Sequence, residues 1–261
     1  FAVFFLYPAY VLTILKVDLG FQTSGMTSAK VIPNPEYQRI GVLKGDSITF
    51  SSALTPTVAL ANSDYAWSGE KTGNGPSISV TFNNLGNSRT ENLQVLGCNK
   101  TATITVIEVP PPDQATWAFL MTTLYGPAWV LKINDLANEA LAWAQTNWSA
   151  LGGSSSVHNC RADAARHAYW NVLIIMEGYT PADAWGAGQA HERSNIAAGG
   201  PHNESVMDLE NNQKGINMGA GLATRAAAQA AVINALNAGN LTYLDDLTNS
   251  GERGLLQPTN K

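Results

Sequence analysis

The chain has 261 residues, of which 45% are hydrophobic and 13% are charged, so it can bury a sizeable core and is not globally disordered. The formal net charge is −5 and no stretch is rich in Lys or Arg, which argues against a nucleic-acid partner. The only cysteines, Cys98 and Cys160, are too few and too far apart for a zinc–thiolate site or a disulfide framework.

Residues 1–25 begin with an uncharged apolar run, FAVFFLYPAYVLTIL, that ends at Lys16. The run is shorter than the roughly 20 residues of a membrane-spanning helix and contains Pro8. Three interpretations compete: the apolar core of an export signal, a strand that a neighbouring subunit or the next domain covers, and a membrane anchor. Each favours an extracellular or cell-surface location. The expected partners are a membrane or cell envelope, or further copies of the chain in a homo-oligomer.

Residues 26–109 predict an all-β domain. Short segments of alternating polar and apolar residues are separated by turns rich in Gly, Asn and Ser, which is typical of an antiparallel sandwich. Trp67 lies within one of these segments, where a sandwich would bury it. The segments are GVLKGDSITF (41–50), DYAWSG (64–69), SISVTF (77–82), ENLQVLGC (91–98) and TATITVIEV (101–109).

The order of these motifs resembles bacterial Ig-like modules of the polycystic-kidney-disease type. A KGD turn is followed by a W-S-G strand, a G-x-G-x-S-x-S-V-x-F stretch, a Gly-Cys pair and a closing T-A-T-I-T-V strand. The resemblance implies an Ig-like β-sandwich that acts as a spacer or adhesive unit. It therefore indicates architecture more than activity.

A proline-rich linker at 110–114, within VPPPDQ, ends the β region, because consecutive prolines cannot continue a strand. Residues 115–261 then predict a mainly α domain of five or six helices, followed by a tail that forms a short strand pair or packs on the surface. The expected helices span 115–124, 134–148, 160–176, 181–195, 206–219 and 221–238, with Asn134, Asn159, Thr180 and Ser205 as N-caps.

All four histidines lie between residues 158 and 202, which directs attention to the helical domain. In NCRADAARHAYW (159–170), Asp163 and His167 are four residues apart and share one face of a helix. Asp163 would accept the Nδ1 proton of His167 and fix its tautomer, as a general base or metal ligand requires. The alternative is an Asp–His pair that serves only capping and the helix dipole.

Two further helices carry polar clusters. His191 and Glu192 are adjacent in AHERSN, but Asn195 occupies the position where a zinc protease would have the second histidine of HExxH, so that class is rejected. In MDLENN, Asp208 and Asn212 share a face with a glycine at 215 that allows another backbone to approach closely. For this third cluster the alternative is a solvated polar face.

The ordered motifs D-A-x-R-H-A-x-W-N, A-H-E and M-D-L-x-N-N-x-x-G resemble an uncharacterised bacterial helical domain family. Its members lie at the C-termini of secreted proteins, some of which resemble polymorphic toxins. The resemblance implies a site and not a reaction. One departure is Ile216, where the family motif continues with Arg, so a basic contact is in doubt. The matching positions are Asp163, Arg166, His167, Trp170, Asn171, His191, Glu192, Met207, Asp208, Asn211, Asn212 and Gly215.

Two functional hypotheses follow. In the first the domain is a hydrolase in which His167, oriented by Asp163, activates water, and Arg166 or the paired asparagines stabilise negative charge. In a variant of it, a divalent metal such as zinc, held by His167, His191 and Asp208 with Glu192 beside them, activates the water. The candidate catalytic residues are Asp163, Arg166, His167, His191, Glu192, Asp208 and Asn212.

In the second hypothesis the polar residues form a buried hydrogen-bond network that locks the helices of a non-enzymatic surface or filament subunit. That subunit would assemble through the apolar N-terminal segment and the Ig-like domain. The sequence does not choose between the two. Side-chain atoms of His167, His191 and Asp208 gathered around an open cleft would favour chemistry, and a closed cluster would favour structure.

Overall fold

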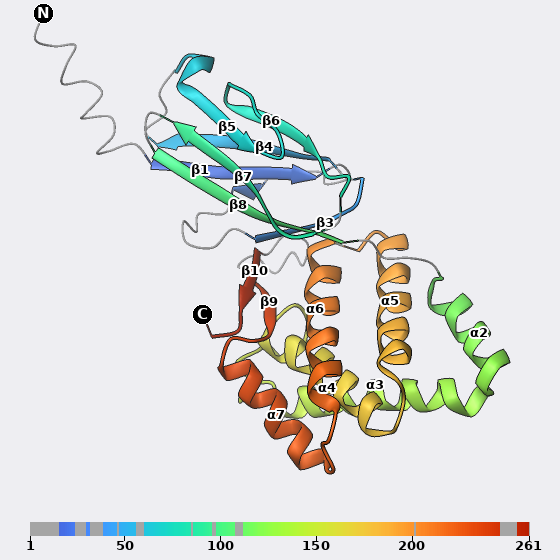
Figure 1. The fold of residues 1–261 in the computed structure, drawn as a ribbon. Coiled ribbons are helices and arrows are strands. Elements are labelled where there is room, and N and C mark those ends of the chain that lie inside the picture. Colours follow the sequence, from blue (N-terminus) through green and yellow to red (C-terminus); the bar gives the residue numbers. More distant parts are fainter. Residues whose placement is uncertain are drawn as a thin grey trace, which may run out of the picture. The chain divides into compact units, whose positions relative to one another are not determined.

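A computed structural model describes residues 16–23, 30–31, 39–45, 47–55, 60–84, 86–95, 98–107, 112–200, 202–245 and 255–260. The chain divides into two compact units, Phe1–Glu108 and Val109–Lys261. Within the described residues the first unit is strand-rich and the second contains six helices, as predicted (Figure 1). The apolar run at residues 1–15 lies outside the described residues.

The described strands of the first unit form two four-stranded sheets. All pairs among them are antiparallel except β3 and β8, which run parallel. One sheet has the order β2-β1-β4-β6, with β1 Lys16–Thr23, β2 Lys30–Val31, β4 Ser47–Thr55 and β6 Ser77–Thr81. The other has the order β3-β8-β7-β5, with β3 Arg39–Leu43, β8 Cys98–Ile107, β7 Gly86–Val95 and β5 Tyr65–Gly69; a 3₁₀ turn, η1 Asn62–Asp64, precedes β5.

The core of the first unit receives side chains from both sheets. In β6 the apolar Ile78 and Val80 are buried while the polar residues between them are exposed, as the period of two in a strand requires. Trp67 is buried as predicted, donates its indole N–H to the carbonyl of Gly75 at 2.8 Å, and has its ring 6.3 Å from that of Phe50 in the other sheet.

The parallel pairing of β3 with β8 departs from the predicted antiparallel sandwich, and two further details of the first unit also differ from the prediction. Strand β1 precedes residue 26, where the predicted β region began. The residues between the predicted segments 77–82 and 91–98 were expected to form a turn, but β7 already begins at Gly86, and its pairing with β8 shifts register between Gly86 and Arg89. Turn-forming residues therefore start a strand here, because an irregular pairing tolerates them.

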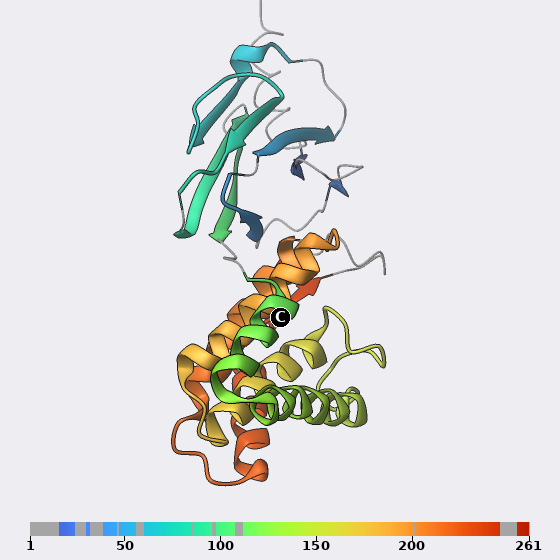
Figure 2. The same cartoon turned by 90° about the vertical axis from the view of Figure 1, so that its right-hand side faces the viewer.

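The second unit contains α2 Gln114–Tyr125, α3 Pro127–Asn147, α4 Arg161–Met176, α5 Pro181–Ala197, α6 His202–Gly219 and α7 Arg225–Asn237. Its tail forms the predicted strand pair, β9 Thr242–Asp245 with β10 Leu255–Pro258. The chain turns sharply between α2 and α3 at Gly126, which has a φ of 88° (Figures 1 and 2). Among the described helices, none is both long and apolar enough to cross a membrane.

The helix starts were predicted less well than the helices. Thr180 caps α5 as predicted, because its hydroxyl accepts the N–H of Asp183 while the Asp183 carboxylate accepts the N–H of Thr180. Pro127 is tolerated in the first turn of a helix, so α3 begins there and not at residue 134. Three predicted caps are wrong, because α3 and α6 begin earlier and the N-cap of α4 is Cys160: Asn134, Asn159 and Ser205.

Helix α4 is the centre of the second unit and contacts α3, α5, α6 and α7. Its buried alanines allow these neighbours to approach closely, and Gly215 of α6 does the same from the other side. A Cβ atom at Gly215 would lie 2.2 Å from the carbonyl oxygen of Ala168. Polar side chains on the facing surfaces of α4 and α6 are therefore enclosed in the interior.

The contact at Gly215 predicts that Gly215→Ala destabilises the helical unit. The added methyl group must push the backbones of α4 and α6 apart, and overpacking of this kind costs about 1–3 kcal/mol. Chemical denaturation followed by the helical circular dichroism signal measures the change. Lys214→Ala is the matched control, since Lys214 is exposed and surface substitutions stay within about 0.5 kcal/mol. Equal unfolding midpoints for the two variants would contradict the close contact.

Candidate functional site

Asp163, in the first turn of α4, links the helix start to a buried polar network. It is 1% exposed. Its Oδ2 accepts the backbone N–H of Asn159 at 2.6 Å, and its Oδ1 accepts the Nε–H of Arg166 at 2.7 Å. The carboxylate thus satisfies a backbone group at the helix start, as the capping alternative expected. It also holds the guanidinium of Arg166 in place.

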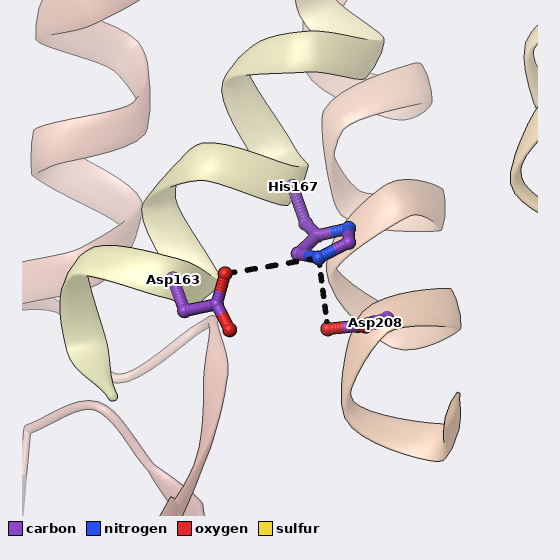
Figure 3. A group of neighbouring side chains, drawn as sticks. All are labelled: Asp163, His167 and Asp208. Atoms are coloured by element: carbon purple, nitrogen blue, oxygen red, sulfur yellow. Dashed lines mark ion pairs between the residues drawn. The ribbon is translucent and has the colours of Figure 1, made fainter. Parts of the chain in front are cut away.

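His167 is 1% exposed and has a partner at each ring nitrogen. Nδ1 lies 3.2 Å from Oδ1 of Asn212. Nε2 lies 2.5 Å from Nη2 of Arg166. The same nitrogen lies 3.0 Å from Oδ1 of Asp208 and 3.8 Å from Oδ1 of Asp163 (Figure 3). The expectation that Asp163 accepts the Nδ1 proton is therefore wrong, because the ring turns its other nitrogen toward Asp163.

These contacts assign the tautomer of His167. A guanidinium has only donors. Oδ1 of Asp208, although 3.0 Å from Nε2, has no partner in hydrogen-bond geometry among the described residues, so Nε2 offers its lone pair to Arg166 and the proton lies on Nδ1. Nδ1–H then donates to Oδ1 of Asn212, the same oxygen that accepts Nδ2–H of Asn171 at 2.7 Å. Burial lowers the pKa of His167 well below its ordinary value, and the positive charge of Arg166 lowers it further. The imidazole is therefore neutral.

Two more carboxyl groups are buried close by. Burial raises the pKa of Asp208 well above its ordinary value, and the neighbouring carboxylates of Glu192 and Asp163 raise it further. Burial also raises the pKa of Glu192 to about 7. Among the described residues neither carboxylate oxygen of Glu192 has a partner in hydrogen-bond geometry, although the Ser205 hydroxyl lies near enough to oppose part of the shift. The raised pKa values let these groups carry protons where charge would be costly.

A cavity of about 380 Å³ lies beside this network. His191 lines it together with Arg166 and His167. Burial lowers the pKa of His191, and the charge of Arg166 lowers it further, so this imidazole is also neutral. Within the described part of the chain it forms no hydrogen bond or ion pair. The remaining lining is mostly apolar and comes from four helices: Gln114, Trp117, Ala118, Val130, Leu131, Ile133, Asn134, Ala137, Trp170 and Ala187.

The predicted site residues do not all lie together. Five of the candidate catalytic residues form the network between α4 and α6, which Asn171 joins: Asp163, Arg166, His167, Asp208 and Asn212. His191 meets that network at the cavity, whereas Glu192 is fully buried and does not line the cavity. The Asn211 side chain forms two hydrogen bonds with the backbone of Thr242 in β9. Asn211 therefore connects α6 to β9.

Sequence reasoning missed the cavity walls. Trp117 and Val130 come from α2 and α3, which the polar motifs do not reach. The available signal was the stretch 114–131, which contains no charged residue although it forms two helical segments at the surface of the unit.

The residues able to share a metal ion differ from the predicted set. One ligand atom from each of Asp163, His167 and Asp208 lies within 4.8 Å of the others, whereas His191 is not part of the group. Imidazole and carboxylate ligands suit zinc and similar ions. However, Nη2 of Arg166 already lies 2.5 Å from Nε2 of His167 and 2.7 Å from Oδ1 of Asp163. A divalent cation would bind there only after this guanidinium withdraws.

Residues 120–240 match the model of a family described as a domain of unknown function (DUF6973). The match covers the helical region and includes every candidate site residue. It confirms that this region resembles a domain family, and it carries no activity with it. No solved structure matches the chain.

The pKa of Glu192 predicts a pH dependence of stability. Because the pKa is about 7 in the folded protein against an ordinary value of 4.5, the folded state binds this proton more tightly than the unfolded state. The resulting stability is fully present below pH 4.5 and is lost as the pH rises through 7. Glu192→Gln removes this titration. The melting temperature of Glu192→Gln minus that of the wild type should therefore be larger at about pH 8 than at about pH 5.

Melting temperatures of the full chain, followed by the helical circular dichroism signal, measure this difference. Asp135→Asn is the control, because Asp135 is exposed on α3 and its neutralisation leaves the buried carboxyl groups unchanged. The expectation fails if Glu192→Gln and Asp135→Asn show the same pH dependence as the wild type.

Proposed function

We propose that the helical unit is a hydrolase that uses water to cleave an ester whose apolar part lies in the cavity. A single feature carries this proposal: the polar end of a largely apolar cavity combines one guanidinium with two neutral imidazoles. Cavities that are mostly apolar, with a few convergent polar groups of shifted pKa, are the usual form of a small-molecule site.

His191 is the better candidate for the general base, although the sequence favoured His167. Both ring nitrogens of His167 are engaged, by Arg166 and Asn212. A general base needs a free lone pair within reach of the proton it removes. His191 lines the cavity, has no hydrogen-bond partner among the described residues, and is kept neutral by its lowered pKa.

Arg166 is the candidate for stabilising negative charge. Its Nε and Nη2 are held by Asp163 and His167, and within the described residues Nη1 forms no hydrogen bond and remains for a ligand. A donor that is fixed in advance stabilises negative charge that develops during a reaction. Asp163 and His167 then act on the reaction through Arg166, as positioning residues.

The reaction follows from these roles. The oxygen of a water molecule forms a bond to the ester carbonyl carbon while one water proton moves to the free nitrogen of His191. The carbonyl oxygen becomes negative and lies against the Arg166 guanidinium. The bond from carbon to the alcohol oxygen then breaks, and the His191 imidazolium returns its proton to that oxygen. The products are an acid and an alcohol.

For the rest of the chain we propose an Ig-like sandwich that serves as a spacer in a secreted or cell-surface bacterial protein. The two four-stranded sheets and the contact between Phe50 and Trp67 support the sandwich, and the low fraction of charged residues agrees with that location. The finer resemblance of the helical unit to domains of secreted, toxin-like proteins belongs to the same proposal. So does self-assembly, or attachment to a membrane or cell envelope, through the apolar N-terminal segment.

The hydrolase proposal predicts that His191→Ala lowers kcat for a hydrolysed ester by about 10²- to 10⁴-fold, the usual contribution of general acid–base catalysis. Arg166→Gln should lower it by about 10²- to 10³-fold, as loss of an oxyanion donor does. Rates on chromogenic carboxylic esters of increasing chain length measure both effects.

His158→Ala is the matched control, because the side chain of His158 is 52% exposed and does not line the cavity. It should retain the wild-type rate, and circular dichroism should show that all three variants are folded. A wild-type chain that hydrolyses no ester, or a folded His191→Ala variant with the full rate, would exclude this mechanism. The structural hypothesis for the network would then remain.

A further inference from the structure

We infer that the cavity binds a single-chain amphiphile with an anionic head, placing the head at Arg166 and the chain between α2 and α3. This inference rests on the proposed function only in identifying that amphiphile as the ester's acidic half or a close analogue. Binding itself requires no turnover. A protein that binds the amphiphile without cleaving esters would therefore still agree with this inference.

The residues that line the cavity show that it has an exposed end and a buried end. Gln114, Leu131 and Asn134 line it and are exposed, so they mark its mouth. His167 and Trp117 also line it and are buried, so they mark its floor. A ligand with a polar end and an apolar body can therefore place its polar end on the inner polar groups while its body passes between apolar walls toward solvent.

The charges at the inner end select the head group. Burial lowers the pKa of both imidazoles there, and the charge of Arg166 lowers each further, so Arg166 supplies the positive charge that faces the cavity. Asp163 lies against Nε and Nη2 of this guanidinium, which leaves Nη1 for a ligand. An oxyanion such as a carboxylate or phosphate monoester is the natural partner of a guanidinium.

The size and walls of the cavity select the body. A volume of about 380 Å³ lies at the lower end of the range of roughly 300–1,000 Å³ for small-molecule sites, which suits one chain better than two. Trp117 and Ile133 provide flat and branched apolar walls without a buried charge. Burying the surface of a flexible apolar chain against such walls makes the free energy of binding more favourable.

Apolar surface continues out of the cavity, which favours a long chain over a compact ligand. Leu131 lines the mouth and is 61% exposed. Tyr125, 58% exposed, stacks on Trp129, and Trp129 contacts Trp117 of the cavity wall. Two further side chains of α2, Phe119 and Leu124, are 70% and 66% exposed, an unusual density of exposed apolar groups. A chain longer than the cavity keeps apolar contact after leaving it.

Calorimetric titration of the full chain with dodecyl phosphate, below its micelle-forming concentration, tests the inference. We expect saturable binding of one molecule per chain. Inorganic phosphate, which offers the head alone, and dodecyl maltoside, which offers the chain with an uncharged head, should each bind at least about tenfold more weakly, a difference of about 1.4 kcal/mol. Arg166→Gln should remove the preference for the phosphate over the maltoside.

Two variants test the place of binding. Ala137→Phe fills the cavity and should lower the affinity for dodecyl phosphate at least about tenfold, whereas Ala142→Phe, at an exposed position of the same helix, should not. Leu131→Glu, at the exposed mouth, should also weaken binding. Because Leu131 is exposed, this variant tests the site even if Ala137→Phe fails to fold. Equal binding of the phosphate and the maltoside, or equal affinities of the phenylalanine variants, would overturn the inference. Binding without ester hydrolysis would overturn only the proposed function.

Discussion

The position of one guanidinium determines the arrangement of the polar interior. Asp163, Glu192 and Asp208 are each less than 5% exposed, and burying several carboxylates together is costly unless they are paired or protonated. Arg166 pairs with Asp163, while the other two carboxyl groups have raised pKa values. Burial acts to lower the pKa of Arg166, but the charge of Asp163 and its hydrogen bond, together with the other acidic groups nearby, leave that pKa raised. The site therefore depends on a permanent positive charge at this point.

The contact with Arg166 fixes the tautomer of His167, and this tautomer determines the hydrogen bond from His167 to α6. The guanidinium takes the lone pair of Nε2, so the proton must lie on Nδ1, and Nδ1–H faces the Asn212 side chain of α6. Asn171 donates to the same Asn212 oxygen. These bonds hold α4 and α6 in one register, while Gly215 lets the two backbones meet. The same set of bonds thus serves stability and the placement of Arg166 at the cavity.

Part of this arrangement could be predicted from the sequence. The spacing of Asp163 and His167 placed both on one helical face, and glycine at 215 indicated the close approach of another backbone; both features depend on local geometry. The partner of each ring nitrogen could not be predicted, because it depends on a side-chain rotation that only the packing of α6 decides. His191 was grouped with a metal site for the same reason, whereas the structure sets it at the cavity.

The cavity walls were beyond the reach of sequence reasoning, since they come from α2 and α3, whose relation to α4 is a matter of tertiary packing. The sequence did show that residues 114–131 lack charge, but a buried helix pair would have explained that equally well.

The tautomer of His167 is the most direct test of the account, because it follows only if Arg166 occupies Nε2. Nitrogen-15 chemical shifts of the imidazoles, recorded from about pH 8 to about pH 6.5, distinguish the tautomers and the charged form. We expect His167 to remain neutral across this range with its proton on Nδ1. A proton on Nε2, or an imidazolium at pH 6.5, would contradict it.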